Sequence, residues 1–244
     1  MANCRYIQST TRGRSANRNG LSQLASGAFL LFLDADALPS SADFLSNYCH
    51  EAESADVVVG GTAYRPGYKN KELRVRVGKR KEEIPATLRK QQPYSSFSAF
   101  NFLIRKTLFD QILFSEELVE YGHEDTLFGL ELKYRHAKIA HIDNPAFHMG
   151  IDSGADFMDK TTAAVDGLAN LIAAGKIDED VKLFKAYRSV QKSGFQRAFK
   201  AAHWLLGESL KSGLSKGFLP ILFFDVYKLL RLCSLTIKIG RRMP

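Results

Sequence analysis

The sequence has 244 residues, a net charge of +8, a hydrophobic fraction of 45% and a charged fraction of 25%. These values exclude a wholly disordered chain, and the length suffices for one large domain or one domain with an appendage. Cys4, Cys49 and Cys233 are scattered and form no Cys-x-x-Cys pair, which argues against a disulfide framework and a thiolate zinc site. Residues 1–15 are polar and lack the apolar stretch of a secretory signal, so we expect a cytoplasmic location.

The first sixty residues alternate between helical and strand patterns. The expected elements, in chain order, are a strand over Cys4–Gln8, a helix capped by Ser15 and ended by Gly27, a strand over Ala28–Leu33, a helix from Ser40 towards Glu53, and a strand over Asp56–Val59. The apolar run at 28–33 is continuous, which is typical of a strand covered on both faces. Leu21, Leu24 and Ala25 lie at helical spacing and are the expected inner face of the first helix. This alternation predicts an α/β sheet flanked by helices.

The chain from Arg65 to Gln92 is polar and highly charged, and we interpret it as a long loop with a helical piece near Lys71–Arg80. The elements expected after it are strands over Phe97–Ile104, Lys138–Ile142 and Ala146–Met149, and helices over Thr107–Ile112 and Thr126–Arg135. Beyond Gly150 only helices are expected, over Phe157–Gly175, Asp178–Lys192 and Phe195–Leu210. We therefore predict an α/β domain over residues 1–150 and a helical, basic extension over residues 151–244.

The C-terminal extension is strongly basic, with thirteen Lys or Arg residues against two acids in residues 181–244. Such a surface fits contact with nucleic acid or anionic lipid, and it equally fits a solvated helical face. Binding of single-stranded nucleic acid needs aromatic side chains for stacking, but the aromatic residues here are spaced like a helical core face. The segment Leu219–Ile239 is apolar but interrupted by four charged residues. It therefore predicts either a helix on the inner membrane surface or a packed or dimerising helix, rather than a spanning one.

Asp34 and Asp36 follow directly after the apolar run. Ligands of open α/β sheets bind at the carboxyl ends of strands, so the two carboxylates lie where a binding site is expected. Carboxylates this close raise each other's cost of ionisation, and a divalent cation with attached phosphates relieves that repulsion. The alternative is that one Asp caps the next helix, although Ser40 and Ser41 already offer cap oxygens. The sequence therefore predicts a Mg²⁺ or Mn²⁺ site here.

Arg12, Arg14 and Arg18 cluster around the start of the preceding helix, where the helix macrodipole disfavours cations. A bound anion would reverse that balance, because the free backbone N–H groups at a helix start favour phosphate. Arg18 is therefore a candidate contact for a diphosphate, with solvated arginines as the alternative.

The segment 122–125, Gly-His-Glu-Asp, lies at the start of another predicted helix. Acids at a helix start stabilise the helix by capping alone, and this is one interpretation. The functional interpretation is a general base, because a carboxylate within hydrogen-bond reach can take the proton of a sugar hydroxyl as the new bond forms. His148, just before Gly150, is a candidate metal ligand, with a structural role as the alternative.

Three segments taken together resemble the inverting family 2 glycosyltransferases of the GT-A fold. They are Gly13–Gly20 (GRSANRNG), Ala25–Asp36 (ASGAFLLFLDAD) and Gly122–Thr126 (GHEDT). Asn144–Gly150 (NPAFHMG) is similar to the segment that carries the metal-ligating histidine of that family. The resemblance covers about residues 5–150, and three motifs in the correct order are far more specific than any one of them.

The resemblance implies roles on the donor side of the reaction. Asp34 would lie near the ribose or the metal, and Arg18 would contact the diphosphate of a nucleotide-sugar donor. Asp36 and His148 would ligate Mg²⁺ or Mn²⁺ beside that diphosphate. Asn101 would line the pocket for the donor sugar.

On the acceptor side, the resemblance implies that Asp125 deprotonates the acceptor hydroxyl and that Glu124 holds the acceptor. The implied reaction moves a hexose or similar sugar, with inversion, to a hydroxyl of a glycan or lipid-linked acceptor, as in polysaccharide biosynthesis. No nucleic-acid partner is expected.

One departure from the family concerns the N-terminus. Domains of this family normally begin with a Val/Ile-rich strand ending in a Pro-Thr or Pro-Val turn, followed by the pocket for the nucleobase, whereas here only Cys4–Gln8 precedes the first motif. We therefore expect either that the true start lies upstream of Met1 or that the chain is a fragment with reduced activity. A remnant without catalysis, which binds a partner or a membrane, is the alternative function.

Overall fold

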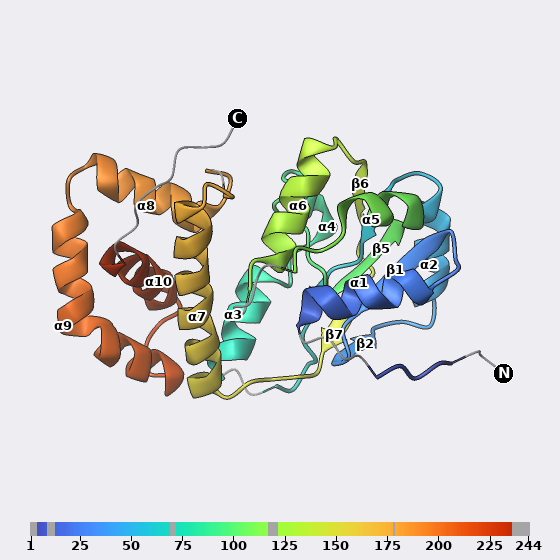
Figure 1. The fold of residues 1–244 in the computed structure, drawn as a ribbon. Helices are drawn as coiled ribbons and strands as arrows, with labels where there is room; N and C mark the ends of the chain where they lie inside the picture. Colours follow the sequence, from blue (N-terminus) through green and yellow to red (C-terminus); the bar gives the residue numbers. More distant parts are fainter. Residues whose placement is uncertain (1–3, 9–12, 69–71, 117–121, 178, 236–244) are drawn as a thin grey trace.

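The computed structural model describes residues 4–8, 13–68, 72–116, 122–177 and 179–235. Two sheets with their flanking helices lie on one side of Figure 1, and a group of C-terminal helices lies on the other. The predicted α/β class, with a mixed sheet flanked by helices and followed by a helical extension, is confirmed.

The larger sheet has the strand order β1-β5-β3-β6. Its strands are β1 (Phe29–Leu33), β5 (Asn101–Arg105), β3 (Val57–Val59) and β6 (Ile139–His141). Strand β5 is antiparallel to both β1 and β3, whereas β3 and β6 are parallel. Consequently the carboxyl ends of β1, β3 and β6 lie at the same edge of the sheet, and the loops that leave this edge carry the predicted site.

The smaller sheet joins two segments that are distant in sequence. It has the order β2-β7-β4, with β2 (Ala37–Pro39), β7 (Ala146–His148) and β4 (Thr62–Ala63). Strand β2 is antiparallel to β7, and Ala37 is opposite His148. Since Asp36 immediately precedes Ala37, this register brings the aspartate next to the histidine.

The core follows the two-residue period of the strands. Val57 and Val59 pack on one face of the larger sheet, together with residues of α5 (Lys106–Ile112) and α6 (Glu124–Tyr134). Val58, between them, packs on the opposite face against α2 (Phe44–Ala52). The sheet is therefore covered by helices on both faces.

The charged segment predicted as a long loop contains α3 (Leu73–Lys81) and α4 (Ala86–Arg89), so the predicted helical piece is present. Leu73 and Val77 of α3 are buried against the C-terminal helices. Helix α3 thereby joins the α/β part to the C-terminal helices.

The C-terminal helices are α7 (Gly154–Ala173), α8 (Lys182–Lys192), α9 (Gln196–Ser215) and α10 (Leu222–Ser234). Helix α10 packs among the other three (Figure 1), and it buries Phe224, Tyr227, Leu230 and Leu232. Packing thus accounts for part of the apolar pattern of the segment, whereas Leu222, Phe223 and Val226 are exposed at 65%, 36% and 38%. Residues 236–239 of the predicted segment lie outside the described residues, and contact with a membrane surface stays a prediction. Among the helices of the described ranges, none combines the length and the apolar character needed to cross a membrane.

Three local expectations at the N-terminal end were wrong. Cys4–Gln8 forms no strand. The first helix, α1 (Arg14–Leu24), has Gly13 as its N-cap and Ala25 as its C-cap, instead of Ser15 and Gly27. Helix α2 begins at Phe44, after the short strand β2, rather than at Ser40. Strand β1 does pack on both faces, with Leu30 and Phe32 on one side and Phe29 and Leu31 on the other, although most of its side chains are only partly buried.

The inner face of α1 also differs from the prediction. Leu21 and Leu24 are exposed, at 52% and 56%, whereas Arg18, Asn19 and Ser22 are buried. Polar contacts to neighbouring loops, rather than apolar packing, therefore orient this helix.

Candidate active site

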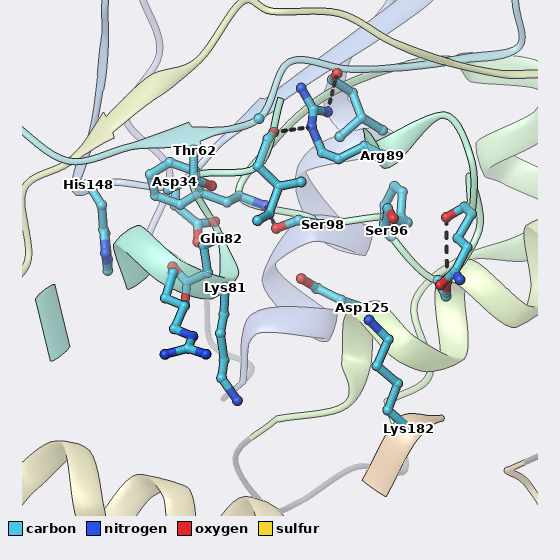
Figure 2. A pocket seen from close by; sticks show the side chains of 18 of the residues that line it. Asp34, Thr62, Lys81, Glu82, Arg89, Ser96, Ser98, Asp125, His148 and Lys182 are labelled. Atoms are coloured by element: carbon cyan, nitrogen blue, oxygen red, sulfur yellow. Dashed lines mark hydrogen bonds between the residues drawn. The ribbon is translucent and has the colours of Figure 1, made fainter. Parts of the chain in front are cut away.

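A cleft of about 1700 Å³ opens between the edge of the larger sheet and the C-terminal helices. Residues of α1, of the loop after β1, of α3, of the loop at 91–98, and of α6, α8 and α10 line it (Figure 2). The predicted residues that line this cleft are Arg18, Asp34, Asp36, Asp125 and His148. Side chains from separate parts of the chain thus line one cleft.

Arg18 is an almost buried cation, 8% exposed, that faces the first aspartate of the pair. Its Nη2 lies 2.7 Å from Oδ1 of Asp34, and its guanidinium lies 5.2 Å from the centre of the Phe114 ring. Its other terminal nitrogen, Nη1, is buried and has no hydrogen-bond partner among the described residues. An unpaired buried donor costs roughly 1–3 kcal/mol, and an anionic oxygen in the cleft would relieve that cost.

Asn19, which the sequence did not single out, holds Arg18 in place. Its Oδ1 accepts from the backbone N–H of Phe114 at 2.9 Å, and its Nδ2 donates to the carbonyl of Phe114 at 2.9 Å. On the same face, the Nζ of Lys106 donates to the carbonyl of Ser22 at 2.9 Å. These bonds explain why the buried face of α1 is polar, because they fix the rotation of the helix that directs Arg18 into the cleft.

Asp36 and His148 form the second pair of predicted residues in the cleft. Oδ2 of Asp36 lies 3.1 Å from Nε2 of His148, and the backbone N–H of Met149 donates to the carbonyl of Asp36 at 2.8 Å. Gly150 makes room for the carboxylate, because a Cβ at this position would lie 2.2 Å from Oδ2 of Asp36. The pairing of β2 with β7 and the missing side chain at residue 150 together set this contact.

The other ring nitrogen of His148, Nδ1, contacts two buried side chains, Arg74 and Tyr64. Nη2 of Arg74 lies 3.1 Å from it, and the phenol oxygen of Tyr64 lies 3.4 Å from it. Glu82 accepts two bonds of 2.9 Å from Arg74 and one of 2.5 Å from Tyr64. A guanidinium can only donate, so its approach to Nδ1 favours the tautomer with the proton on Nε2, which donates to Asp36.

A carboxylate and an imidazole are a suitable pair of ligands for a divalent cation that also binds substrate phosphates. In the described part of the chain, no three His, Cys, Asp or Glu side chains form a group able to hold a metal ion by themselves. For His148 to ligate through Nε2, its proton has to lie on Nδ1, where Arg74 can then no longer donate and the oxygen of Tyr64 is the available acceptor of the N–H. The residues therefore fit a cation that takes further ligands from the substrate.

Asp125 lies in the first turn of α6, and Oδ2 of its carboxylate accepts the backbone N–H of Ala99 at 3.0 Å. Burial, and then the nearby charge of Glu124, raises the pKa of Asp125 to about 6, although the bond from Ala99 opposes the shift. A carboxylate with a pKa near neutrality is suited to general-base catalysis, because it is ionised at pH 7 and still takes up a proton readily.

Neighbouring contacts hold the start of α6. His123 is in the left-handed region, with φ of 70°, after Gly122 with φ of 99°. Nε2 of His123 lies 2.7 Å from the carbonyl of Ala164 in α7, and burial lowers the pKa of this histidine, which therefore donates as a neutral ring. Oε1 of Glu124 lies 3.1 Å from Nη1 of Arg14, so Glu124 lies beside the cleft and joins α6 to α1.

Asn101 is placed differently from the prediction. It is 1% exposed and is not part of the lining of the cleft. Its Oδ1 accepts from the phenol of Tyr48 at 2.6 Å, and its Nδ2 donates to the carbonyls of Gly61 and Asn144 at 3.1 and 3.0 Å. These bonds use the amide to connect the loops after β3 and β6, so its contacts give no support to the predicted role in binding the donor sugar.

No sequence signal marks Tyr64, Arg74 and Glu82 as site residues. Arg74 and Glu82 lie in the charged segment Arg65–Gln92, where single charged residues carry no distinctive signal, and Tyr64 directly precedes it. Only the folded chain shows that α3 brings Arg74 against His148. A weak clue is Gly78, since a Cβ there would lie 2.1 Å from the ring of Tyr64.

Comparison with known proteins gives one match to a protein family. The family model described as Glycosyl transferase family 2 matches residues 2–113. This range contains Arg18, Asp34 and Asp36, whereas Asp125 and His148 lie outside it. No curated protein sequence matches the chain.

Among solved structures, the chain is similar to S. aureus TarS. The match to TarS 1-349 covers 91% of this chain and 69% of TarS 1-349, at 20% identity and a TM-score of 0.42. For TarS 1-349 in complex with UDP the identity is 19% and the TM-score 0.43, with the same coverage. A longer TarS structure gives 19% identity, a TM-score of 0.41 and coverage of 90% of this chain and 42% of that one. These TM-scores are too low to carry an argument, so the likeness to glycosyl transferase family 2 rests on the family model, which matches residues 2–113.

Proposed function

We propose that the protein is an inverting, metal-dependent glycosyltransferase that moves a sugar from a nucleotide diphosphate donor to an acceptor hydroxyl on a glycan or lipid-linked molecule. The family match supports the class of reaction. The convergence of Arg18, Asp36, Asp125 and His148 on one cleft supports the assignment of the site.

The observation that carries the proposal is the buried guanidinium of Arg18. One of its nitrogens is paired with Asp34, while Nη1 is buried without a partner among the described residues. A diphosphate oxygen would complete the hydrogen bonding of this group, and charge-assisted bonds from arginine to phosphate are among the strongest in proteins. Arg18 would thus bind the donor, while Asp34 keeps its guanidinium oriented.

Asp36 and His148 would hold Mg²⁺ or Mn²⁺ beside the diphosphate. When bound, such a cation neutralises the negative charge that develops on the departing nucleoside diphosphate. The chain contributes the positions of the two ligands, since β2 and β7 hold them 3.1 Å apart. Tyr64, whose phenol donates to Glu82, would accept a hydrogen bond from the N–H on Nδ1 of His148.

Asp125 would act as the general base. The acceptor hydroxyl gives its proton to the carboxylate as its oxygen attacks the anomeric carbon, and the bond from that carbon to the diphosphate breaks on the opposite side. A single displacement of this kind inverts the anomeric centre. Ala99 fixes one oxygen of the carboxylate, which leaves the other for the acceptor.

The test is transfer and donor hydrolysis by the full chain with a panel of UDP- and GDP-sugars in the presence of Mn²⁺. We expect activity in the wild type, and a loss of about 10²–10⁴-fold in Asp125→Asn with donor binding kept. Full activity of both Asp36→Ala and Asp125→Asn would reject the assigned roles. Absence of any nucleotide binding at millimolar concentration would favour a non-catalytic remnant instead.

A further inference from the structure

The part of the cleft lined by α3, α8 and α10 carries an excess of positive charge. Lys81, Lys182 and Lys228 reach the cleft from three different helices, α3, α8 and α10. Asp225 of α10 is the acid that two of them share. The rest of the cleft carries three aspartates, Asp34, Asp36 and Asp125, together with Arg14, Arg18 and Arg89.

One carboxylate cannot neutralise two ammonium groups. Lys81 forms an ion pair with Oδ1 of Asp225, and Nζ of Lys228 lies 3.3 Å from the same oxygen. The two lysines also lie against one aromatic ring, with Nζ atoms 5.3 and 4.9 Å from the centre of Phe224. Burial, and then the charge of Lys81, lowers the pKa of Lys228. Lys81, Lys228 and Asp225 together therefore keep a net positive charge, which one further negative charge would balance.

Lys182 adds a third ammonium. It begins α8, and no ion pair or hydrogen bond of its side chain occurs within the described residues. Figure 2 shows the Lys182 side chain directed into the same cavity as the carboxylate of Asp125. The side chain of Lys81 also extends into this cavity.

A second cavity, of about 480 Å³, adjoins the cleft. It lies among α6, α7 and α8, and Asp125, Lys182 and Lys228 line both this cavity and the cleft. Arg18 and Asp36 line only the cleft. The second cavity therefore extends from the proposed base away from the residues proposed to bind the donor, which is the place for the acceptor.

We propose that this second cavity binds the acceptor, that the acceptor carries a phosphate close to its reacting hydroxyl, and that Lys182 and Lys228 bind this phosphate. The proposal rests on the glycosyltransferase function and names the chemical class of its acceptor. Bonds from ammonium to phosphate are charge-assisted, and they would direct the neighbouring hydroxyl towards Asp125. The hydroxyl of Ser96, which lines both cavities, is a further donor for the same ligand.

The test compares two probes that differ by one phosphate. Binding of glucose 6-phosphate and of glucose to the full chain is measured by saturation-transfer NMR, in the wild type and in Lys182→Gln and Lys228→Gln. We expect the phosphate to tighten binding at least about tenfold and each substitution to remove most of this gain. Lys192→Gln, at the other end of α8, is the matched control, and we expect it to keep the gain in affinity from the phosphate. The thermal midpoint of unfolding, measured for each variant, shows whether Lys228→Gln is folded. Lys182 is exposed, so we expect Lys182→Gln to fold like the wild type.

UDP binding with Mn²⁺, measured on the same samples, separates this proposal from the function on which it rests. We expect the lysine variants to bind UDP as the wild type does. If wild-type protein fails to bind UDP, the glycosyltransferase function fails. If UDP binding is intact but glucose 6-phosphate binds no better than glucose, the phosphate-bearing acceptor is wrong. If Lys182→Gln weakens UDP instead, the lysines belong to the donor and the proposal is overturned.

A last arm distinguishes the sources of the phosphate. Flotation with vesicles of phosphatidic acid in phosphatidylcholine, against phosphatidylcholine alone, tests a lipid headgroup. Vesicle binding that needs both phosphatidic acid and Lys182 supports a lipid-borne phosphate. Binding of glucose 6-phosphate without vesicle binding supports a phosphate on a soluble acceptor.

Discussion

Nε2 of His148 lies 3.1 Å from Oδ2 of Asp36, although the two residues are 112 positions apart. The antiparallel register of Ala37 with His148 makes this contact, and the glycine at position 150 leaves space for it. The relationship links a motif after the first strand to a motif before the C-terminal helices. The proposed cation site depends on it.

Gly150→Ala tests the space around the carboxylate. The added methyl would lie 2.2 Å from Oδ2 of Asp36, so the side chain has to move and the proposed ligand pair is lost. We expect Mn²⁺-dependent UDP binding to weaken about 10–100-fold, as changes around metal ligands commonly cause. The control is Gly20→Ala, where the added methyl meets no atom within 4 Å. Equal UDP affinity in both variants would show that the position of Asp36 does not matter.

Tyr64→Phe tests the partner of His148. The variant keeps the ring but removes the oxygen that would accept the proton of Nδ1 when Nε2 ligates a cation. We expect Mn²⁺ to bind at least about 10-fold more weakly, measured by electron paramagnetic resonance of free Mn²⁺. Tyr134→Phe, at a residue that is 61% exposed, is the control and should bind Mn²⁺ like the wild type. Unchanged affinity in Tyr64→Phe would assign the tyrosine to the fold alone.

The pH dependence of transfer reports the base. The pKa of Asp125 is about 6, and only its ionised form accepts a proton. We therefore expect kcat/KM to be level above about pH 7 and to fall about tenfold per pH unit below about pH 6. The control is Asp110→Asn, which alters an aspartate on α5 and should show the same fall of kcat/KM at low pH as the wild type. If the residual activity of Asp125→Asn shows the same fall of kcat/KM at low pH as the wild type, another group is responsible for the pH dependence.

Stability of Asp125→Asn should depend on pH in a direction that follows from the raised pKa. Because the folded pKa of about 6 exceeds the ordinary value of 3.8, folding favours the protonated form. The wild type therefore loses stability as the pH rises from about 4 to about 6, when the native state has to bury a charge. Asparagine stays neutral and still accepts the N–H of Ala99.

We expect Asp125→Asn to be more stable than the wild type at pH 8 by about 2–3 kcal/mol, since each pKa unit corresponds to about 1.36 kcal/mol. Urea unfolding should show this difference at pH 8 and almost none at pH 3.5. A variant that is less stable at both pH values would contradict the raised pKa.

The order of elements could be predicted from the sequence because continuous apolar runs and helical spacing are local signals. The strands at 57–59 and 101–105 and all the C-terminal helices lie where these patterns placed them. Asp34 and Asp36 lie at the cleft because they follow the carboxyl end of β1, whereas Asp125 reaches the same cleft from the first turn of α6.

Other features depend on contacts that no local pattern records. Leu21 and Leu24 are exposed because the bonds of Asn19 to Phe114 set the rotation of α1. Asn19 and Phe114 are 95 positions apart, so no local pattern indicates this contact. Asn101 is buried because its amide bonds to Tyr48 of α2 and to the loops after β3 and β6. The positive lining of the cleft arises only when α3, α8 and α10 pack together.

The central claim is that Asp36 and His148 bind a divalent cation together with the diphosphate of the donor. Calorimetric titration of the full chain with UDP, with and without Mn²⁺, in the wild type and in Asp36→Asn tests it most directly. The account predicts that Mn²⁺ tightens UDP binding at least about tenfold in the wild type and leaves it unchanged in Asp36→Asn. UDP affinity that is the same with and without Mn²⁺ in the wild type, or a gain from Mn²⁺ that survives in Asp36→Asn, would contradict it.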